Sequence, residues 1–215
     1  MTSAYYRRGF SLIEVLLVLG IISLLAALLL PVLATARQVA CVANLHQVGL
    51  GMAMYTQDND GLHPYAVDPV DRVSTSWDVV PEFAAALPHL PWIQDVMQPY
   101  VKSKSVFRCP SDIGFATADF SSILYNVYPS SYEKYGTSYY YRTELAAFHI
   151  NESAIAAPER VNVLFDESGA WHGTLISLAQ RYNVLYADGH TKNVSRARID
   201  EAWAVALRPH LPLFP

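Results

Sequence analysis

The sequence is short of the residues that build several common classes of protein. It has only two cysteines, Cys41 and Cys109, in 215 residues, too few for a disulfide-dense scaffold or a four-thiolate zinc site. Charged residues make up 16% of the chain, compared with about 25% in an average soluble domain. The net charge of −4 argues against a basic nucleic-acid-binding surface as the main feature of the protein. We therefore expect no nucleic-acid partner.

The motifs of common enzymes are also missing. There is no Gly-x-Ser-x-Gly elbow, no His-Glu-x-x-His, no phosphate-binding loop and no Cys-x-x-Cys. The seven histidines are scattered, with no pair four residues apart. Asp166-Glu167 near His172 offers one carboxylate–imidazole pair, but surface or loop histidines are the simpler interpretation. We therefore expect no enzyme, no catalytic residue, no cofactor and no metal site.

What the sequence does have is a long uncharged segment near its N-terminus. Val15 to Ala36 is a run of 22 residues without a charge, and a membrane crossing needs about 20. The run is longer than the core of a secretory signal peptide, and no Ala-x-Ala site closes it. Arg7 and Arg8 precede it, which predicts a cytoplasmic N-terminus and an outward C-terminal domain. A plain anchor leaves Glu14 unexplained, since a carboxylate at the head of a spanning helix is costly.

The segment Arg7-Arg8-Gly9-Phe10-Ser11-Leu12-Ile13-Glu14, with the apolar run after it, resembles the class III signal of type IV pilins and type II secretion pseudopilins. The resemblance implies cleavage by a prepilin peptidase between Gly9 and Phe10, N-methylation of Phe10, and an assembly role for Glu14. We expect Phe10 to about Pro31 to form the hydrophobic core of a filament, which also gives Pro31 a place in assembly. The carboxylate of Glu14 would pair with the ammonium of Phe10 on a neighbouring subunit, which offsets the cost of both buried charges and sets axial register.

The helical pattern continues beyond the uncharged segment. Apolar residues recur at steps of three and four, which predicts an amphipathic helix; they are Val39, Val42, Leu45, Val48, Met52 and Tyr55. One helix from about Phe10 to Gln57 is expected, ended by the turn-forming Asp58-Asn59-Asp60-Gly61, which lacks the glutamate of an EF-hand. Pro31 predicts a kink, because it lacks the N–H that would bond the carbonyl of residue 27. Gly49 and Gly51 indicate close packing against a sheet, with a hinge as the alternative.

The remaining residues predict an α+β domain. Residues 61–90 read as loop, Trp92 to Val101 as a short helix, Ser105 to Asp112 as a turn-rich link, and Ile199 to Leu207 as a final helix. Strands are expected from their β-branched and aromatic content at Ser138 to Leu145, Val161 to Asp166, Tyr182 to Ala187 and His190 to Val194. Asp188-Gly189 is a strong signal for the hairpin between the last two. The predicted divisions are a leader at 1–9, a membrane or filament-core helix at 10–36, its amphipathic half at 37–58 and an outward domain at 59–215.

This globular part resembles a pilin-like family with a C-terminal H-x9-DG signature. The resemblance is carried by Cys41 to Leu50, by Val106 to Asp112 and by Leu185 to His190. One position departs from the signature: the histidine expected ten residues before Asp188 is Leu178, and His172 lies out of place. The fold that the resemblance implies is a long N-terminal helix packed on a small antiparallel sheet.

Two features leave alternatives open. Cys41 and Cys109 form a disulfide if the domain lies in an oxidising compartment, or they are two separate thiols. Seven of the 14 tyrosines lie within residues 125–141, either as an aromatic cover for a sheet or as a filament or adhesive contact.

The function expected from these features is self-assembly into a type IV pilus-like filament. The partners would be other copies of the chain, the prepilin peptidase, a pilus or type II secretion assembly platform, and membrane lipid. The location would be the bacterial inner membrane, followed by a periplasmic or cell-surface filament. The alternatives are a pseudopilin of a type II secretion system, or an anchored periplasmic binding domain that does not polymerise. The sequence does not separate a major from a minor subunit and does not identify a cargo.

Overall fold

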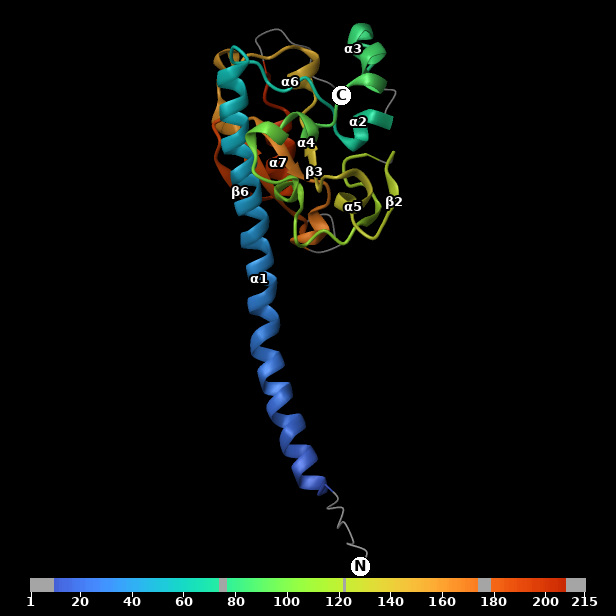
Figure 1. Ribbon diagram of the computed structural model, residues 1–215, viewed down its shortest axis with the longest axis vertical. Coiled ribbons are helices and arrows are strands. Elements are labelled where there is room, and N and C mark those ends of the chain that lie inside the picture. Colours follow the sequence, from blue (N-terminus) through green and yellow to red (C-terminus); the bar gives the residue numbers. More distant parts are fainter. Residues whose placement is uncertain (1–9, 74–76, 122, 174–178, 208–215) are drawn as a thin grey trace, which may run out of the picture. The chain divides into compact units, whose positions relative to one another are not determined.

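The computed structural model of the chain describes residues 10–73, 77–121, 123–173 and 179–207. The predicted leader, 1–9, and Leu178 therefore lie outside the described residues. The described chain divides into two compact units at Arg37 and Gln38, and its elements are helices and antiparallel strands, so the α+β class is confirmed. Figure 1 shows the elements in chain order by colour.

Helix α1 runs from Leu12 to Asp58, within two residues of the predicted bounds. It ends as the sequence predicts: Gly61 has a positive φ of 78° and donates its N–H to the carbonyl of Thr56 at 2.7 Å. Pro31 lies inside the helix, and the hydroxyl of Thr35 donates to its carbonyl oxygen at 3.1 Å. The kink at Pro31 stays a prediction.

The buried stripe of α1 in the second unit is not quite the predicted one. Cys41, Leu45, Val48 and Met52 are buried, at steps of four, three and four residues. Val39 does not join them, because it is 62% exposed and lies off the face that begins at Cys41. The stripe therefore starts at the cysteine, and the expectation for Val39 was wrong.

The main sheet has four antiparallel strands in the order β3-β4-β5-β6. Their bounds are Tyr139–Tyr141, Asn162–Asp166, Arg181–Tyr186 and Thr191–Ser195. The last three agree with prediction to within about one residue. The first is shorter than the predicted Ser138 to Leu145, because the chain turns into helix α6 (Glu144–Ala147).

The two faces of this sheet bury separate hydrophobic clusters. Tyr139 and Tyr141 belong to the cluster that contains the buried stripe of α1, whereas Tyr140 belongs to the other cluster, with Phe165 and Val184. This is the alternation that a strand with both faces covered requires. A β-carbon on Gly49 would stand 2.7 Å from Leu185 on β5, so this glycine lets α1 approach the sheet closely. Close packing, rather than a hinge, accounts for it.

The prediction of a loop over residues 61–90 was wrong. This region holds helices α2 (Pro69–Val73) and α3 (Pro81–Ala86) and the 3-10 helix η1 (Leu87–His89). In each of the three, a proline occupies one of the first two positions, where its missing N–H costs nothing. Three of the four prolines in this region, Pro69, Pro81 and Pro88, therefore stand at helix starts, whereas Pro64 lies outside any helix.

Several short elements complete the domain. Strands β1 (Phe115–Thr117) and β2 (Tyr125–Val127) form a second, two-stranded antiparallel sheet that the sequence did not indicate. The predicted helix at Trp92 to Val101 is α4 (Ile93–Val96) followed by η2 (Gln98–Tyr100), and the predicted final helix is α7 (Arg196–Trp203), which starts three residues earlier than expected. The other short elements are η3 (Lys104–Phe107), α5 (Ser131–Tyr135), η4 (Glu152–Ala154), η5 (Pro158–Arg160) and η6 (Gly169–Trp171).

Candidate processing and assembly site

The start of α1 is closed by a reciprocal cap. The backbone N–H of Ser11 donates to Glu14 Oε2 at 2.8 Å, and the backbone N–H of Glu14 approaches the hydroxyl of Ser11 at 3.3 Å. This is the capping-box pattern, which satisfies two N–H groups that the first helical turn leaves without partners. Phe10 precedes the cap and is 83% exposed, while Gly9 lies outside the described residues. The spacing of Ser11 and Glu14 could have shown this cap from sequence.

The first part of α1 carries a large exposed apolar surface. Its most hydrophobic window has a mean hydropathy of 2.9, and none of that window is buried among the residues that the structure describes. Every large apolar side chain from Phe10 to Leu33 is exposed by 47% or more. Exposed apolar patches of more than a few hundred Å² mark surfaces that meet a membrane or another protein. By length and composition this helix is able to cross a membrane.

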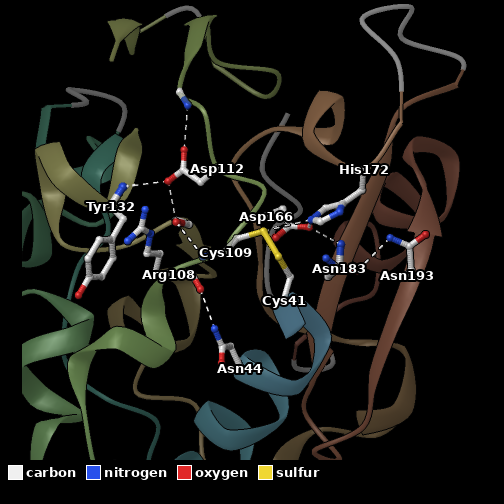
Figure 2. Close-up of a disulfide and its surroundings, with 12 residues drawn as sticks. Cys41, Asn44, Arg108, Cys109, Asp112, Tyr132, Asp166, His172, Asn183 and Asn193 are labelled. Carbon is white, nitrogen blue, oxygen red and sulfur yellow. Dashed lines mark hydrogen bonds and ion pairs between the residues drawn. A yellow bond between two sulfur atoms is a disulfide. The ribbon is translucent and has the colours of Figure 1, made fainter. Parts of the chain in front are cut away.

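The second unit is joined across the sequence by a disulfide. Cys41 on α1 and Cys109 after η3 are bonded, with Cα atoms 4.7 Å apart and both side chains fully buried (Figure 2). Close by, the side-chain amide of Asn44 donates to the carbonyl of Arg108 at 2.8 Å, which fixes the same segment to α1. Of the two alternatives from the sequence, this structure contains the pair.

A buried histidine lies beside the disulfide. His172 Nε2 is 3.2 Å from Cys109 Sγ and 3.4 Å from Asp166 Oδ2 (Figure 2). Burial lowers the pKa of His172 to about 4 and raises that of Asp166. The imidazole is therefore neutral near pH 7. Sequence reasoning noticed His172 near Asp166-Glu167 but could not place it against a cysteine 63 residues away. With both sulfurs in a disulfide, neither is a thiolate available to a metal.

The link after Cys109 is organised by one carboxylate. Asp112 Oδ1 accepts the backbone N–H groups of Gly114 and Ser131, at 2.9 and 3.1 Å. Its Oδ2 accepts the N–H of Tyr132 at 2.9 Å and the hydroxyl of Ser138 at 2.7 Å. One buried side chain thereby ties the disulfide segment to α5 and to the start of β3 (Figure 2).

The Asp188-Gly189 hairpin joins β5 and β6. Gly189 has a φ of 85°, in the left-handed region that favours glycine. Asp188 Oδ1 lies 3.1 Å from the backbone nitrogen of His190 and 2.5 Å from its ring Nδ1, and this imidazole stacks on Tyr186 with ring centroids 4.3 Å apart. The histidine next to this turn is thus His190, while Leu178 lies outside the described residues.

The tyrosine-rich segment divides in two. Tyr139, Tyr140 and Tyr141 on β3 are buried, which is the expected aromatic cover of a sheet. Tyr125 and Tyr128, by contrast, are 67% and 55% exposed, on and just after β2. Tyr132 and Tyr135 are half-buried, so Tyr125 and Tyr128 are the most exposed tyrosines of this segment.

Comparison with known proteins agrees with the geometry of the N-terminus. Residues 5–30 match the model of the prokaryotic N-terminal methylation motif. No curated protein and no solved structure matches the chain. The motif spans the basic pair, the glycine–phenylalanine junction, Glu14 and most of the apolar run. It supports a type IV pilin-like protein that a prepilin peptidase processes and that is anchored in a membrane.

Proposed function

We propose that this chain is a pilin-like subunit that assembles into a type IV pilus-like filament. The observation that carries the proposal is the combination of the methylation motif with an apolar helix surface that is exposed among the residues that the structure describes. Membrane lipid covers this face before assembly, and the same face of other copies covers it afterwards. Phe10 to about Pro31 form the filament core.

Cleavage before Phe10 creates the charge that assembly uses. The new α-amino group is a cation at the head of an apolar helix, and Glu14 is the only acidic residue in the first turns of α1. Within one chain the Glu14 carboxylate caps Ser11. In a filament, the same carboxylate accepts the ammonium of Phe10 from a neighbouring subunit, so that two charges enter the core as a pair.

The second unit, from Gln38 onward, is the exported surface of the subunit. Its disulfide fits an oxidising compartment, and Arg7 and Arg8 hold the leader in the cytoplasm. We also propose that the globular part is the pilin-like domain with the H-x9-DG signature, altered at Leu178. Its role is structural, and the chain catalyses no reaction. The pilus or type II secretion assembly platform extracts it from the inner membrane.

The alternative of a type II secretion pseudopilin shares every N-terminal feature, so the deletion phenotype separates the two. Deletion of the chain's gene should remove surface filaments from electron micrographs and leave the secreted proteins in the medium unchanged. Loss of secreted proteins with filaments intact would favour the pseudopilin. An anchored domain that does not polymerise would give only monomer when the protein is crosslinked in cells at its native level.

A further inference from the structure

A small cavity in the second unit is lined by carboxyl groups and aromatic rings. Its volume is about 120 Å³. The carboxyl groups belong to Asp68, just before α2, to Asp71 within it, and to Glu144, the first residue of α6. The rings are those of Trp77, Phe120, Tyr140, Phe165 and Trp203. Phe120 and Trp203 are half-buried, so the cavity reaches the surface beside them.

Two polar atoms of this lining have no partner. The Tyr140 hydroxyl and Glu144 Oε2 make no hydrogen bond in the part of the chain that the structure describes, although the two residues are only 3% and 8% exposed. Leaving a buried polar group without a partner costs about 1–3 kcal/mol, and more for a charged group. The fold thus leaves one carboxyl oxygen and one hydroxyl without a partner on two residues that line the cavity.

The other two carboxyl groups already have their partners. Asp68 accepts the backbone N–H groups of Asp71 and Tyr141, at 2.9 and 3.0 Å. Asp71 accepts the indole N–H of Trp77 at 2.8 Å. These bonds hold the acidic side chains and the Trp77 ring in place and leave Glu144 as the carboxyl group with a free oxygen.

Arg142 makes none of its hydrogen bonds to these carboxyl groups in the part of the chain that the structure describes. Arg142 directs its guanidinium N–H groups to Asn162 Oδ1 and to the carbonyls of Ala202, Trp203 and Val205, so none of these bonds reaches Glu144. Burial, only partly offset by Arg142, raises the pKa of Glu144 to about 7, and burial also raises the pKa of Asp68. Among the described residues Glu144 Oε2 therefore has no hydrogen-bond partner, and an N–H donor placed in the cavity would supply one.

We propose that this cavity binds a primary alkylammonium group, the charged end of a small amine or of a lysine side chain. Its N–H groups would donate to Glu144 Oε2 and to the oxygen of Tyr140, and its alkyl chain would lie against the aromatic rings. Cations bind ring faces when the water is displaced. An apolar cavity of about 150 Å³ holds a benzene-sized molecule, so the space here suits an amino group with about four carbons.

An inorganic divalent ion fits the site less well. Among the described residues, the ligand atoms close enough together to hold a metal belong to Cys41, Cys109 and His172, not to this cavity. The arrangement therefore favours an organic cation.

The test is titration calorimetry on the full-length protein in detergent, with n-butylammonium chloride as the probe. We expect saturable binding, weakened about tenfold or more by Glu144→Gln and a few-fold by Tyr140→Phe, because each removes one acceptor or its charge. Matched controls are Glu152→Gln and Tyr125→Phe, which change exposed residues of the same types and should bind as the wild type does. Tetramethylammonium, which has no N–H group, should bind more weakly than n-butylammonium.

Two further probes test whether the site also takes lysine side chains and whether it binds calcium instead of an amine. Binding of Nα-acetyl-lysine methylamide as well as n-butylammonium would extend the site to lysine side chains, whereas binding of n-butylammonium alone would restrict it to free amines. The proposal is overturned if n-butylammonium shows no saturable binding, if Tyr140→Phe and Glu144→Gln both bind as the wild type does, or if calcium chloride binds and tetramethylammonium and n-butylammonium do not. If Glu144→Gln fails to fold, Tyr140→Phe against Tyr125→Phe decides.

Discussion

At the scale of single residues, Gly9 separates the basic pair of the leader from Phe10 and the apolar run. A peptidase needs an extended backbone at the bond that it cuts, and glycine offers no side chain to obstruct it. We expect Gly9→Val to leave the uncleaved chain in the membrane, as measured by intact mass. Gly20→Val is the matched control, since a β-carbon at Gly20 meets nothing within 4 Å. Normal cleavage of the Gly9→Val chain would contradict the assignment of the junction.

Glu14 has two candidate roles that mutation separates, the cap on Ser11 and the partner of a neighbouring α-amino group. Glu14→Ala should be inserted and cleaved but assembled poorly, because loss of one partner of a buried ion pair costs about 3–5 kcal/mol. Ser11→Ala removes the side-chain part of the cap, worth about 1 kcal/mol, and keeps the carboxylate. Filament yield from both strains is the readout. If the two variants lose filaments equally, the cap rather than the intersubunit pair explains the glutamate.

The burial of His63 predicts how the free energy of unfolding changes as the pH falls. Its ring is 6% exposed, neither ring nitrogen has a hydrogen-bond partner within the described chain, and burial lowers its pKa to about 4. The unfolded chain takes up the proton near the ordinary value of about 6.5, so this histidine should destabilise the fold as pH falls from 6.5 towards 4, by up to about 3 kcal/mol. Denaturant unfolding of the wild type and of His63→Phe should diverge over this range, with the variant gaining. Parallel curves would show that His63 protonates equally well in the folded state.

At the scale of elements, the sequence predicted the helices, strands and turns that depend on local pattern. It missed the short elements that depend on long-range contacts. Helix α1, strands β4 to β6 and the Asp188-Gly189 turn follow from periodicity, β-branched content and glycine's positive φ. The β1–β2 ribbon and α5 are too short to be read in that way. Ser130 caps α5 locally, whereas Asp112 accepts the backbone N–H of Ser131 from 19 positions away. The indole of Trp171 donates to the carbonyl of Gly114, just before β1, across 57 positions.

The same division between local pattern and long-range contact applies to the candidate sites. The methylation signal is local, so Gly9, Phe10 and Glu14 could be named from the sequence. The cavity between α2, β3 and α6 could not, because Asp68 and Glu144 are 76 positions apart in sequence and each resembles an ordinary surface acid there. Only the fold buries them together.

The disulfide is a covalent cross-link between α1 and the segment that follows η3. Cys41 and Cys109 close a loop with a sequence separation of 68, for which chain entropy gives about 4 kcal/mol. We expect the double variant Cys41→Ala, Cys109→Ala to lose roughly that much of its free energy of unfolding in denaturant. Reductant should destabilise the wild type and leave the double variant unchanged. Equal stability of both proteins without reductant would show that helix–sheet packing holds the domain alone.

At the scale of the whole molecule, the chain combines an exposed apolar helix with a second unit that has a buried hydrophobic core. The large apolar side chains from Phe10 to Leu33 are exposed among the described residues, while the second unit buries both faces of its main sheet. An apolar surface of this extent requires lipid or another protein to cover it. The proposed function as a filament subunit therefore depends on whether the processed chain is found in filaments.

The most direct measurement is mass spectrometry of the N-terminal peptide in filaments sheared from cells that produce this chain. The account predicts a subunit that begins at Phe10 and carries one methyl group on its α-amino nitrogen. The contradicting result is a filament fraction without the chain, while the membranes of cells with an active prepilin peptidase hold it with residues 1–9 still attached.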